Sequence, residues 1–344
     1  MQTLPQPEVA PATPAVPPQI AIVQMASGNW VSQMVYTAAK LGIADLLTEA
    51  KTCQELATAT NSNPDALYRL LRSLASVGVF AETEAGTFTL TPLAACLQSD
   101  VPGSMRAFVI MLGEEHYEAW RHLLHSVQTG ESAFNHLYGM NIFEYYAGHA
   151  ESARIFDQAM TNFSTVENAA VVAGYDFSNI HTLVDVAGGH GTLLNDIVQA
   201  NSQLQGILFD QPDVIESARA ANALNPRIQL ISGSFFESLP SGGDAYLLKH
   251  IVHDWDDVRS IEILKQCHQA MGDQGKLLIV EYVIPEGNEP FVGKLLDLNM
   301  LVMCPGGRER TAAEFQALFE KAGFRLTQIV PTASDISVIE GIKA

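Results

Sequence analysis

Residues 183–191, LVDVAGGHG, decide the fold of this chain. The stretch begins as a short apolar run, breaks into glycines and continues as TLLNDIVQA, whose apolar residues recur at helical spacing. A strand, a glycine-rich turn and a helix are therefore expected in that order. Glycine lets the main chain take a positive φ and approach a ligand closely, and the new helix presents free N–H groups to the same space. The turn is a candidate site for a nucleotide-like cofactor.

Short apolar strands and amphipathic helices alternate around and after this turn. Strands are expected in HTLVDVA, QGILFD, RIQLIS, DAYLLKH and KLLIVEYVI, with helices between them and after the last. This alternation predicts an α/β domain with a Rossmann-like, doubly wound parallel sheet. The final stretch, FRLTQIVPTASDISVIEGIK, predicts an antiparallel C-terminal hairpin at the edge of that sheet.

The patterning divides the chain into four parts. Residues 1–19 are rich in Pro and Ala without periodicity, which predicts a disordered arm. Residues 20–102 show a long apolar helical pattern, then a helix, a turn, a second helix and a two-stranded wing, which predicts a winged-helix domain. Its apolar helical segment is expected to pack in a core or against a second subunit of a dimer. Residues 103–175 are mainly helical and rich in aromatic residues and Met, and residues 176–344 contain the predicted sheet.

The composition limits the classes of partner. The chain has 38 Asp and Glu against 19 Lys and Arg, a net charge of -19, so the basic surface by which winged helices bind DNA is missing. No apolar run approaches the roughly 18 residues of a membrane-spanning helix, and no secretory signal is recognised. The four cysteines lack paired spacing, which fits reduced cytoplasmic thiols. We expect a cytoplasmic protein, and a small molecule rather than nucleic acid or membrane as its ligand.

The glycine-rich turn favours one class of cofactor. Ligands of open parallel sheets bind beyond the carboxyl ends of the strands, and Asp210 ends the second strand, 19 residues after Gly191 (210 − 191). An acid at about that distance can accept hydrogen bonds from ribose hydroxyls. NAD is disfavoured because no third glycine follows Gly189-x-Gly191 at the required place. The acidic-x-small-x-Gly-x-Gly spacing that begins at Asp185 instead matches the nucleoside-binding turn of S-adenosylmethionine enzymes.

His253, which follows the strand DAYLLKH, is the candidate catalytic residue. A neutral imidazole with a pKa near ~6.5 can accept a proton from a hydroxyl, although a packed core histidine is the alternative. Glu281, at the end of KLLIVE, could orient this ring by accepting its other N–H, or be a solvated strand-end carboxylate. A metal site formed by His250 and His253 with Asp254, Asp256 and Asp257 is disfavoured, because the sequence lacks a second ligand cluster at helical spacing and Asp256-Asp257 stand where a helix N-cap is expected.

Six segments together resemble the class I S-adenosylmethionine-dependent O-methyltransferases, the plant phenolic type and its bacterial small-molecule relatives. They are LVDVAGGHG, LFDQPDVI, DAYLLKHIVHDWDD, ILKQCHQAM, GKLLIVEYVIP and GGRERTAAEFQALFEKAGF. The resemblance runs from about residue 20 to the C-terminus. It implies S-adenosylmethionine as methyl donor, S-adenosylhomocysteine as product, and a winged-helix dimerisation domain that contributes to the partner's substrate pocket.

The resemblance also implies roles for individual residues. His253 would be the general base, flanked by the acids Glu281 and Glu309, and would transfer a methyl group to a hydroxyl without a metal. The expected cofactor-binding residues are Asp185, Gly188, Gly189, Gly191, Asp210, Gln211, Ser234, Phe235 and Lys249. The expected substrate-binding residues are Met111, His116, Trp120, Met160, Phe163 and Asp254, a mixture that suits an aromatic or cyclic hydroxyl compound. Two departures from the family pattern are Ala187 in place of glycine and Ser234-Phe235 in place of an Asp-Met pair.

Two other functions remain compatible with these residues. One is a decarboxylase or hydroxylase on the same scaffold, which retains S-adenosylmethionine as a positive centre. The other is a non-catalytic ligand-binding regulator, which would be expected to have lost the base and its acids. The mass of the product separates the enzymes, because methyl transfer adds one CH2 and the other reactions do not.

Overall fold

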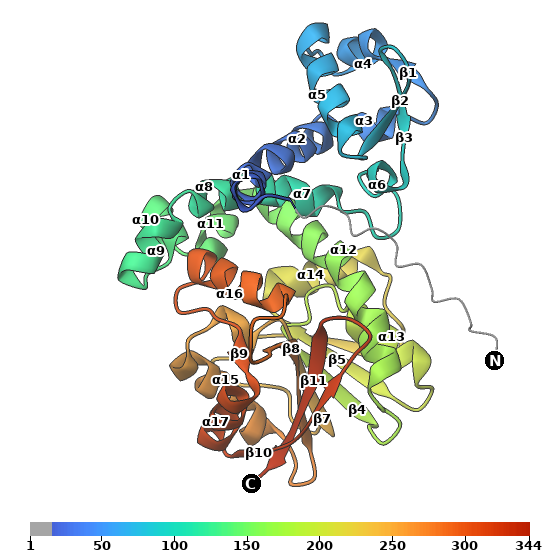
Figure 1. Cartoon of the computed structure of the whole chain (residues 1–344). Coiled ribbons are helices and arrows are strands. Elements are labelled where there is room, and N and C mark those ends of the chain that lie inside the picture. The colour runs from blue at the N-terminus through green and yellow to red at the C-terminus, as the bar shows by residue number, and fades with distance from the viewer. Residues whose placement is uncertain (1–15) are drawn as a thin grey trace, which may run out of the picture. The chain divides into compact units, whose positions relative to one another are not determined.

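The computed structural model describes residues 16–344, which form two compact units that divide after Ala95 (Figure 1). The predicted arm, residues 1–19, lies mostly outside the described residues. Its last two residues, Pro18 and Gln19, open helix α1 (Pro18–Ala26) instead. Proline suits the first helical turn, where its missing N–H would have no partner. The predicted end of the arm is therefore two residues too late.

The first unit contains three N-terminal helices, then a helix-turn-helix and a wing. After α1 its elements are α2 (Gly28–Lys40), α3 (Ile43–Leu46), β1 (Lys51–Thr52), α4 (Cys53–Ala59), α5 (Pro64–Ser76), β2 (Phe80–Glu84), β3 (Thr87–Leu90) and α6 (Pro92–Ala95). The long helical pattern is divided at Ser27 and at Gly42, whose φ of +67° is left-handed. The three strands form an antiparallel sheet in the order β1-β3-β2, and β1 was not predicted.

Local capping sets the start of the two winged-helix helices. Thr52 and Glu55 form a reciprocal capping box at α4, and Asn63 accepts the Ala66 N–H at the start of α5. One face of α5 is buried through leucines at helical spacing: Leu67, Leu71 and Leu74. The wing turns at Gly86, which has a φ of +79°. The predicted winged-helix arrangement is confirmed.

The second unit, Cys96–Ala344, combines the sheet with the helices that precede it. Its helices are α7 (Arg106–Gly113), α8 (Glu115–Trp120), α9 (Leu123–Thr129), α10 (Ala133–Tyr138), α11 (Ile142–Gly148), α12 (Ala150–Gly174), α13 (Thr192–Ala200), α14 (Pro212–Ala221), the 3-10 turn η1 (Val252–Asp254), α15 (Asp257–Ala270), α16 (Val292–Met303) and α17 (Ala312–Ala322). Its strands are β4 (Thr182–Val186), β5 (Gln205–Asp210), β6 (Ile228–Ser232), β7 (Ala245–Lys249), β8 (Lys276–Ile284), β9 (Arg310–Thr311), β10 (Phe324–Pro331) and β11 (Ile336–Lys343).

The main sheet is the doubly wound sheet that the sequence predicts. Its order is β10-β11-β8-β7-β4-β5-β6, with β9 beside β8. Strands β6, β5, β4, β7 and β8 are parallel, whereas β11 runs antiparallel to both β8 and β10. The C-terminal hairpin therefore closes one edge of the sheet, as expected (Figure 1).

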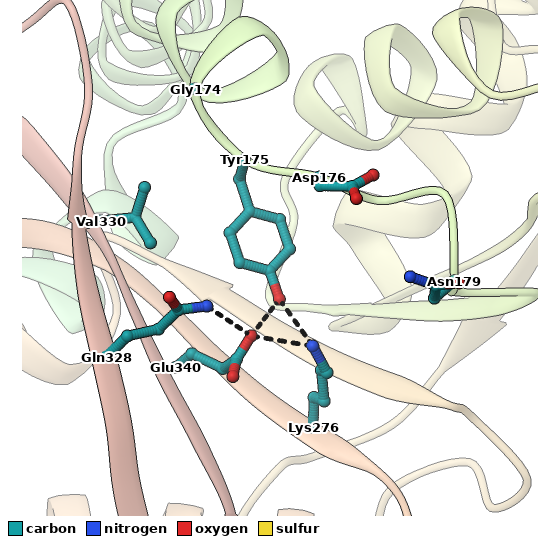
Figure 2. A pocket seen from close by; sticks show the side chains of 8 residues that line it. All are labelled: Gly174, Tyr175, Asp176, Asn179, Lys276, Gln328, Val330 and Glu340. Carbon is teal, nitrogen blue, oxygen red and sulfur yellow. Dashed lines mark hydrogen bonds and ion pairs between the residues drawn. The ribbon is translucent and has the colours of Figure 1, made fainter.

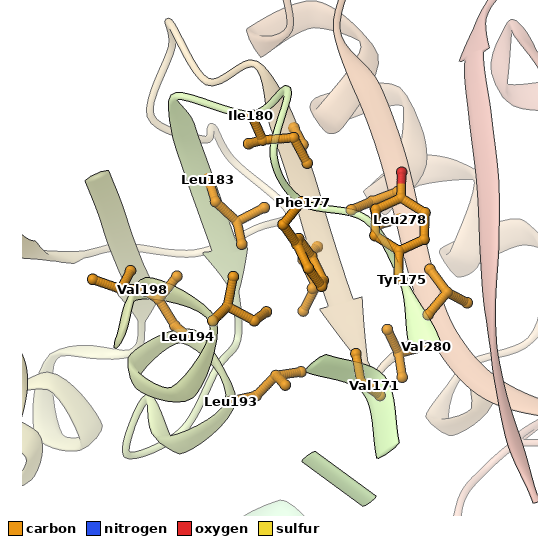
Figure 3. Packing of buried hydrophobic residues seen from close by; sticks show 14 of the residues in the cluster. Val171, Tyr175, Phe177, Ile180, Leu183, Leu193, Leu194, Val198, Leu278 and Val280 are labelled. Carbon is orange, nitrogen blue, oxygen red and sulfur yellow. The ribbon is translucent and has the colours of Figure 1, made fainter. Parts of the chain in front are cut away.

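Different helices cover the two faces of this sheet. Successive side chains of a strand point to opposite faces, so Leu183 and Val184 of β4 belong to different clusters. On the first face, Leu183 packs with Val171 of α12 and Leu194 of α13 (Figure 3). On the second face, Val184 packs with Leu264 of α15 and with residues of α17. This burial on both faces explains the nearly continuous apolar runs of the parallel strands.

Helix α16 is the main element that the sequence analysis missed. Its apolar residues do not keep to one face, since Leu295 is exposed whereas Met300 is buried. Helical periodicity therefore gave no clear signal. The helix packs against α8, α9 and α10 and shares a buried cluster with α8, α10 and α11. Within residues 16–344 no helix combines the length and apolar composition needed to cross a membrane.

Candidate active site

The strand order places the glycine-rich turn at the centre of one sheet edge. β4 lies between β5 and β7, where the winding of the chain changes direction. Ligands of open α/β sheets bind beyond the carboxyl ends of the strands at such a point. The loops that follow β4, β5, β6, β7 and β8 therefore define the candidate site.

Gly188 has no space for a side chain, whereas Gly189 faces open space. A Cβ atom on Gly188 would lie 2.4 Å from Asp185 Oδ2 and 2.6 Å from Leu208 Cδ1. Gly189 and Gly191 take left-handed φ angles of +59° and +72°, and Gly191 is the N-cap of α13. The turn is therefore a bare main-chain surface at the start of a helix, which is the form that a closely approaching nucleoside needs.

Ala187 has a backbone conformation that glycine adopts more readily than alanine. Its φ is +58°, in the left-handed region, and its N–H donates to the Phe209 carbonyl oxygen at 2.7 Å. A side chain in this region costs about 1–2 kcal/mol. The departure from the family pattern therefore leaves the turn in place at a modest cost in stability.

Two acids border the turn. Asp210 Oδ2 accepts the Gly189 N–H at 2.8 Å, and its Oδ1 accepts the Gln211 N–H at 2.7 Å. Asp185 is 2% exposed; burial, with the nearby charge of Asp210, raises its pKa to about 7, while Lys249 opposes the rise. Burial also raises the pKa of Asp210, against the two N–H donors. Carboxylates beside a bare main-chain turn fit a ligand that carries ribose hydroxyls and a positive charge.

The loops after β6 and β7 meet through aromatic rings. Phe235 and Phe236 each contact Trp255 edge-to-face, with ring centroids 6.1 Å and 4.9 Å apart. Ser234 Oγ accepts the Phe236 N–H at 3.3 Å. Trp255 was not among the predicted site residues, although its place directly after His253-Asp254 was a usable signal.

His253 is buried in the 3-10 turn η1, with 7% of its surface exposed. Its Nδ1 lies 2.7 Å from Glu309 Oε1, and its backbone N–H donates to Glu281 Oε1 at 3.0 Å. The ring therefore bonds to Glu309. The expectation that Glu281 accepts a hydrogen bond from the ring is wrong, because Glu281 accepts one from the main chain of His253 instead. With Nδ1–H donated to Glu309, the neutral ring leaves Nε2 free to accept a proton, and the nearest acid there is Asp254, at 3.6 Å.

The acids around His253 control its charge. Burial alone lowers the pKa of this imidazole, but the carboxylates of Glu309, Asp254 and Glu281 outweigh burial and raise the pKa to about 10. Burial raises the pKa of Asp254 and of Glu281, and the neighbouring imidazolium opposes both rises. The cluster thus stabilises the protonated ring, which is the state that a base reaches after it accepts a proton.

Arg310, which the sequence analysis missed, ties the His253 loop to the chain after α16. It is 1% exposed, and it donates to the carbonyl oxygens of Val252 and Trp255 at 3.0 and 2.9 Å. It also donates to Asp257 Oδ1 at 2.9 Å and to Ser260 Oγ at 3.3 Å. A charged residue inside GGRERT was the available signal, but its partners could not be read from the sequence.

Glu167 of α12 is a second buried residue that was missed. Its carboxylate accepts from Lys249 Nζ at 2.8 Å, His250 Nε2 at 2.9 Å and Tyr282 Oη at 2.9 Å. Burial would raise its pKa, but the hydrogen bonds and charges of His250 and Lys249 lower it to about 2. Lys249, an expected cofactor residue, also donates to Ser164 Oγ at 2.9 Å. Glu167 thus links α12 to the ends of β7 and β8.

Two of the residues in the disfavoured metal alternative, Asp256 and His250, make other interactions. Asp256 is the N-cap of α15 and accepts the Arg259 N–H at 2.8 Å, as the sequence predicts. His250 bonds to Glu167, and its ring stacks on His253 with centroids 5.1 Å apart. Among residues 16–344 no group of three or more His, Cys, Asp or Glu side chains is arranged to hold a metal ion.

The predicted substrate-binding residues Met111, Met160 and Phe163 lie on two paired helices. Met111 is buried on α7, and the other two lie on α12, which packs along α7. Phe163 stacks on Phe108 of α7 with ring centroids 5.1 Å apart. Their contact with a substrate stays a prediction.

His116 and Trp120 lie on α8, the next helix of this part. Trp120 Nε1 donates to Asn299 Oδ1 of α16 at 2.9 Å. His116 is 5% exposed, and its Nε2 lies 3.2 Å from Tyr146 Oη. The sixth predicted residue, Asp254, is half-buried beside His253, and Cys304 Sγ lies 3.6 Å from its Oδ1.

A pocket of about 290 Å³ lies at the start of β8, beside the C-terminal hairpin (Figure 2). It is lined by Lys276, the first residue of β8, and by Tyr175, Gln328 and Glu340. The Glu340 carboxylate accepts from all three of these side chains. Burial raises its pKa, but these bonds and one from Thr327 lower the pKa to about 2. The cluster is a satisfied structural network and not part of the candidate active site.

The chain matches two protein families along most of its length. Residues 23–100 match the O-methyltransferase dimerisation domain, and residues 120–325 match the O-methyltransferase domain. The chain is 50% identical to the phenazine O-methyltransferase PhzM of Lysobacter antibioticus over 330 residues, 95% of this chain and 96% of that protein. It is 37% identical over 313 residues to the 3-amino-4-hydroxybenzoate 4-O-methyltransferase of Streptomyces cremeus, 90% of this chain and 86% of that protein.

A solved structure is similar to this chain in both fold and sequence. NcsB1, an O-methyltransferase from neocarzinostatin biosynthesis in complex with S-adenosylmethionine and 2-hydroxy-5-methyl naphthoic acid, aligns with a TM-score of 0.81 and 30% identity. The alignment covers 94% of this chain and 98% of NcsB1. Together with the bare glycine turn, the acids beside it and the winged-helix unit, these matches show that the chain belongs to the S-adenosylmethionine-dependent small-molecule O-methyltransferases.

Proposed function

We propose that this enzyme methylates a hydroxyl of an aromatic or cyclic small molecule, with His253 as the general base. The observation that carries the proposal is the bond between His253 Nδ1 and Glu309 at 2.7 Å, inside a buried acidic cluster. That bond orients the ring and directs the free Nε2 away from Glu309, as an acid does in other catalytic triads. No side-chain nucleophile is needed in this scheme.

The reaction follows from these contacts. His253 Nε2 accepts the hydroxyl proton as the substrate oxygen forms its bond to the methyl carbon, and Glu309 stabilises the imidazolium that results. Glu281 keeps the main chain of His253 in place. When bound, S-adenosylmethionine supplies an electrophilic methyl group on a sulfonium that leaves as a neutral thioether. The protein's main contribution is to align the two reactants and to exclude water.

The residues around the sheet edge would hold the cofactor. In this proposal Asp210 binds the ribose hydroxyls, the main chain at Gly189 binds the methionine end, and Lys249 contacts the cofactor from the end of β7. The remaining assigned residues are Asp185, Gly188, Gly191, Gln211, Ser234 and Phe235. Support comes from the open space beside Gly189 and from Asp210, whose Oδ2 accepts the Gly189 N–H at 2.8 Å and so lies next to that space.

Methyl transfer itself is the first test of this function. The purified enzyme is incubated with S-adenosylmethionine and a panel of phenols, catechols, hydroxynaphthalenes and hydroxyphenazines, and the products are analysed by mass spectrometry. We expect S-adenosylhomocysteine together with a product heavier by one CH2. If the substrate loses CO2 or gains oxygen and S-adenosylmethionine is not consumed, the result would instead favour a decarboxylase or hydroxylase. Failure to bind S-adenosylmethionine would overturn the proposal.

The acids around His253 predict how the rate depends on pH. Because they raise the pKa of His253, the fraction of neutral base increases as the pH rises above neutrality, and kcat/KM should rise with it. Glu309→Gln removes the carboxylate that bonds the ring, so the pKa falls and the rising limb should move to lower pH, with a lower plateau. The measurement is a pair of pH–rate profiles. A limb that stays in place or moves to higher pH in Glu309→Gln would contradict the assignment.

Chelation is expected to leave the reaction unchanged. The proposed chemistry uses an imidazole base and a sulfonium donor and requires no Lewis acid. Activity is measured after dialysis against EDTA, and again after addition of Mg²⁺ or Zn²⁺, with the dialysed enzyme in plain buffer as control. Loss of activity that only a metal restores would favour a metal site and remove the simple base mechanism.

We also propose that the enzyme is a cytoplasmic homodimer that forms through its N-terminal unit. The match to a dimerisation domain supports this, as do apolar side chains exposed in the single chain, with Ile22 63%, Met25 76% and Trp30 68% exposed. An exposed cluster of this kind is typical of an interface. Light scattering coupled to gel filtration tests it, and a mass of one chain at micromolar concentration would rule it out.

A further inference from the structure

The ring of His253 ends a row of three stacked rings. His250 lies face to face with His253, with ring centroids 5.1 Å apart and ring planes inclined by 25°. Tyr282 of β8 stacks on His250 in the same manner, at 5.6 Å and 27°. Offset stacking at these separations is a favourable arrangement of aromatic rings. The proposed base is therefore packed against a row of rings that begins on β8.

Stacking restrains a motion of His253 that its hydrogen bond to Glu309 leaves open. That bond, 2.7 Å long, holds one atom of the ring, Nδ1. The terminal torsion of a histidine side chain has broad wells, so one bond alone leaves the plane of the ring free to tilt. A second ring packed against its face limits this tilt. The direction in which Nε2 points therefore depends on His250 as well as on Glu309.

The carboxylate of Glu167 on α12 anchors the other two rings of the row. Its Oε2 accepts from His250 Nε2 and its Oε1 accepts from Tyr282 Oη, both at 2.9 Å. Glu167 is 4% exposed, and a carboxylate buried to this extent is tolerated only when it is paired. Its third partner is Lys249, whose Nζ lies 2.8 Å from Oε2. Glu167 thus sets the place of His250 from a helix outside the sheet.

The backbone of His250 adds a second constraint. Its φ is +54°, in the left-handed region, and its N–H donates to the Val280 carbonyl oxygen at 3.2 Å. A side chain in this region costs about 1–2 kcal/mol, and such strain persists where the surrounding contacts hold it. The strained residue joins β7 to the turn η1. The residue that stacks on His253 therefore also sets the path of the chain toward it.

His250 is an uncharged neighbour, which suits a base that becomes a cation. Burial lowers the pKa of His250, and Lys249 and His253 lower it further, whereas Glu167 opposes the shift. The ring is therefore neutral at physiological pH and donates its Nε2–H to Glu167. When His253 accepts the substrate proton, a neutral aromatic ring beside it is attractive, whereas a second imidazolium would repel it.

We propose that Glu167 and His250 are positioning residues for the catalytic base: Glu167 anchors the His250 ring, and this ring holds the plane of the His253 imidazole so that Nε2 faces the acceptor hydroxyl. The inference rests on the proposed function and adds to it two residues that act through His253. Contacts that only stabilise the fold would slow the enzyme by the same factor whether or not the base is present. Positioning of the base predicts that their effect disappears with it.

A double-mutant cycle tests this inference. His250→Ala, which removes the ring, and His250→Phe, which keeps a ring that can stack, are each made alone and together with His253→Gln. Glu167→Gln, which keeps the shape of the side chain and removes its charge, is made in both backgrounds as well. Circular dichroism verifies folding, calorimetry gives the affinity for S-adenosylmethionine, and single-turnover kinetics at saturating cofactor give the rate with a hydroxyl compound of the panel. His268→Ala is the matched control, because this half-buried ring contacts Phe324 at the start of β10 instead of the base.

We expect His250→Ala to slow the methyl-transfer step by about tenfold to a hundredfold, the size of effect that a small misplacement of a reacting group has. The dissociation constant of S-adenosylmethionine and the KM of the acceptor should change little. His250→Phe should retain most of the rate, Glu167→Gln should be slower than the unaltered enzyme, and His268→Ala should match it. In the His253→Gln background, His250→Ala and Glu167→Gln should cause no further slowing, because the base that they position is absent.

Three results would overturn the inference. They are a single-turnover rate of His250→Ala close to that of the unaltered enzyme, an equal slowing by His250→Ala with and without His253, and a rate of His250→Phe as low as that of His250→Ala. If His250→Ala does not fold, Glu167→Gln and Tyr282→Phe, which removes only the Oη bond, take its place in the cycle, and unchanged rates in both would also overturn it. Multiplying losses remove only this inference, whereas turnover of His253→Gln close to that of the unaltered enzyme removes the proposed function with it.

Discussion

Replacing His253 by glutamine is expected to leave S-adenosylmethionine bound and to slow methyl transfer by about 10²–10⁴-fold, the usual contribution of a general base. Glutamine fills a similar volume and can still bond to Glu309, but it cannot accept the substrate proton. The loss should therefore appear in kcat rather than in the dissociation constant of the cofactor. His253→Ala should be at least as slow, because it also removes the packing against His250.

The experiment needs a separate measurement of binding. Calorimetry gives the cofactor affinity of each variant, and single-turnover kinetics give the chemical step. His181→Gln is a suitable control, since its side chain is 80% exposed at the start of β4, away from the carboxyl ends of the strands. Turnover of His253→Gln close to that of His181→Gln would remove His253 from the role of base.

Replacing Arg310 by methionine is expected to destabilise the protein by about 3–5 kcal/mol, the usual cost of removing one partner from a buried charged network. Its guanidinium donates to the carbonyl oxygens of Val252 and Trp255 and to Asp257 and Ser260. Methionine removes all of these bonds and leaves the two carbonyl oxygens with only longer ones, at 3.3 to 3.4 Å, from the Trp255 N–H and the Ser260 hydroxyl. Because Val252 and Trp255 flank the turn that carries His253, activity should fall even under conditions where the variant is folded.

Arg308→Met provides the matched comparison for Arg310→Met. Arg308 pairs with Glu314 at the surface, with 46% of its side chain exposed, and surface ion pairs contribute little to stability. Urea unfolding followed by fluorescence gives the free energy of unfolding of each variant. Equal losses in the two variants would show that the buried network around Arg310 does not support the His253 turn.

Several features of the fold and the site could be predicted from local sequence alone. The strand, turn and helix around Asp185 and Gly191 were predicted, as were the winged helix and the C-terminal hairpin. Each depends on periodicity, capping or glycine within a few residues, where backbone geometry and the burial of one face leave few alternatives. The position of His253 just after the end of a strand was predicted from the same short-range patterns.

The partners of the base could not be predicted in this way. Glu281 is 28 residues from His253 and Glu309 is 56 residues away, and both are acids in plausible positions. Which of them bonds to the ring depends on the path of the chain after α16, a helix whose apolar residues do not mark one face. Arg310 and Glu167 were missed for a similar reason, because each acts through side chains from distant segments.

The sequence by itself predicted most of the order of elements, the class of cofactor and a candidate base, since these depend on short-range patterns of hydrophobicity, glycine and charge. Only the tertiary structure decided that Glu309 and not Glu281 bonds the ring, and that Arg310 donates to the carbonyl oxygens of Val252 and Trp255 on either side of His253. Side-chain pairing between distant segments is decided when strands and helices pack, because only then do burial and unpaired hydrogen-bonding groups make one arrangement lower in free energy than the others.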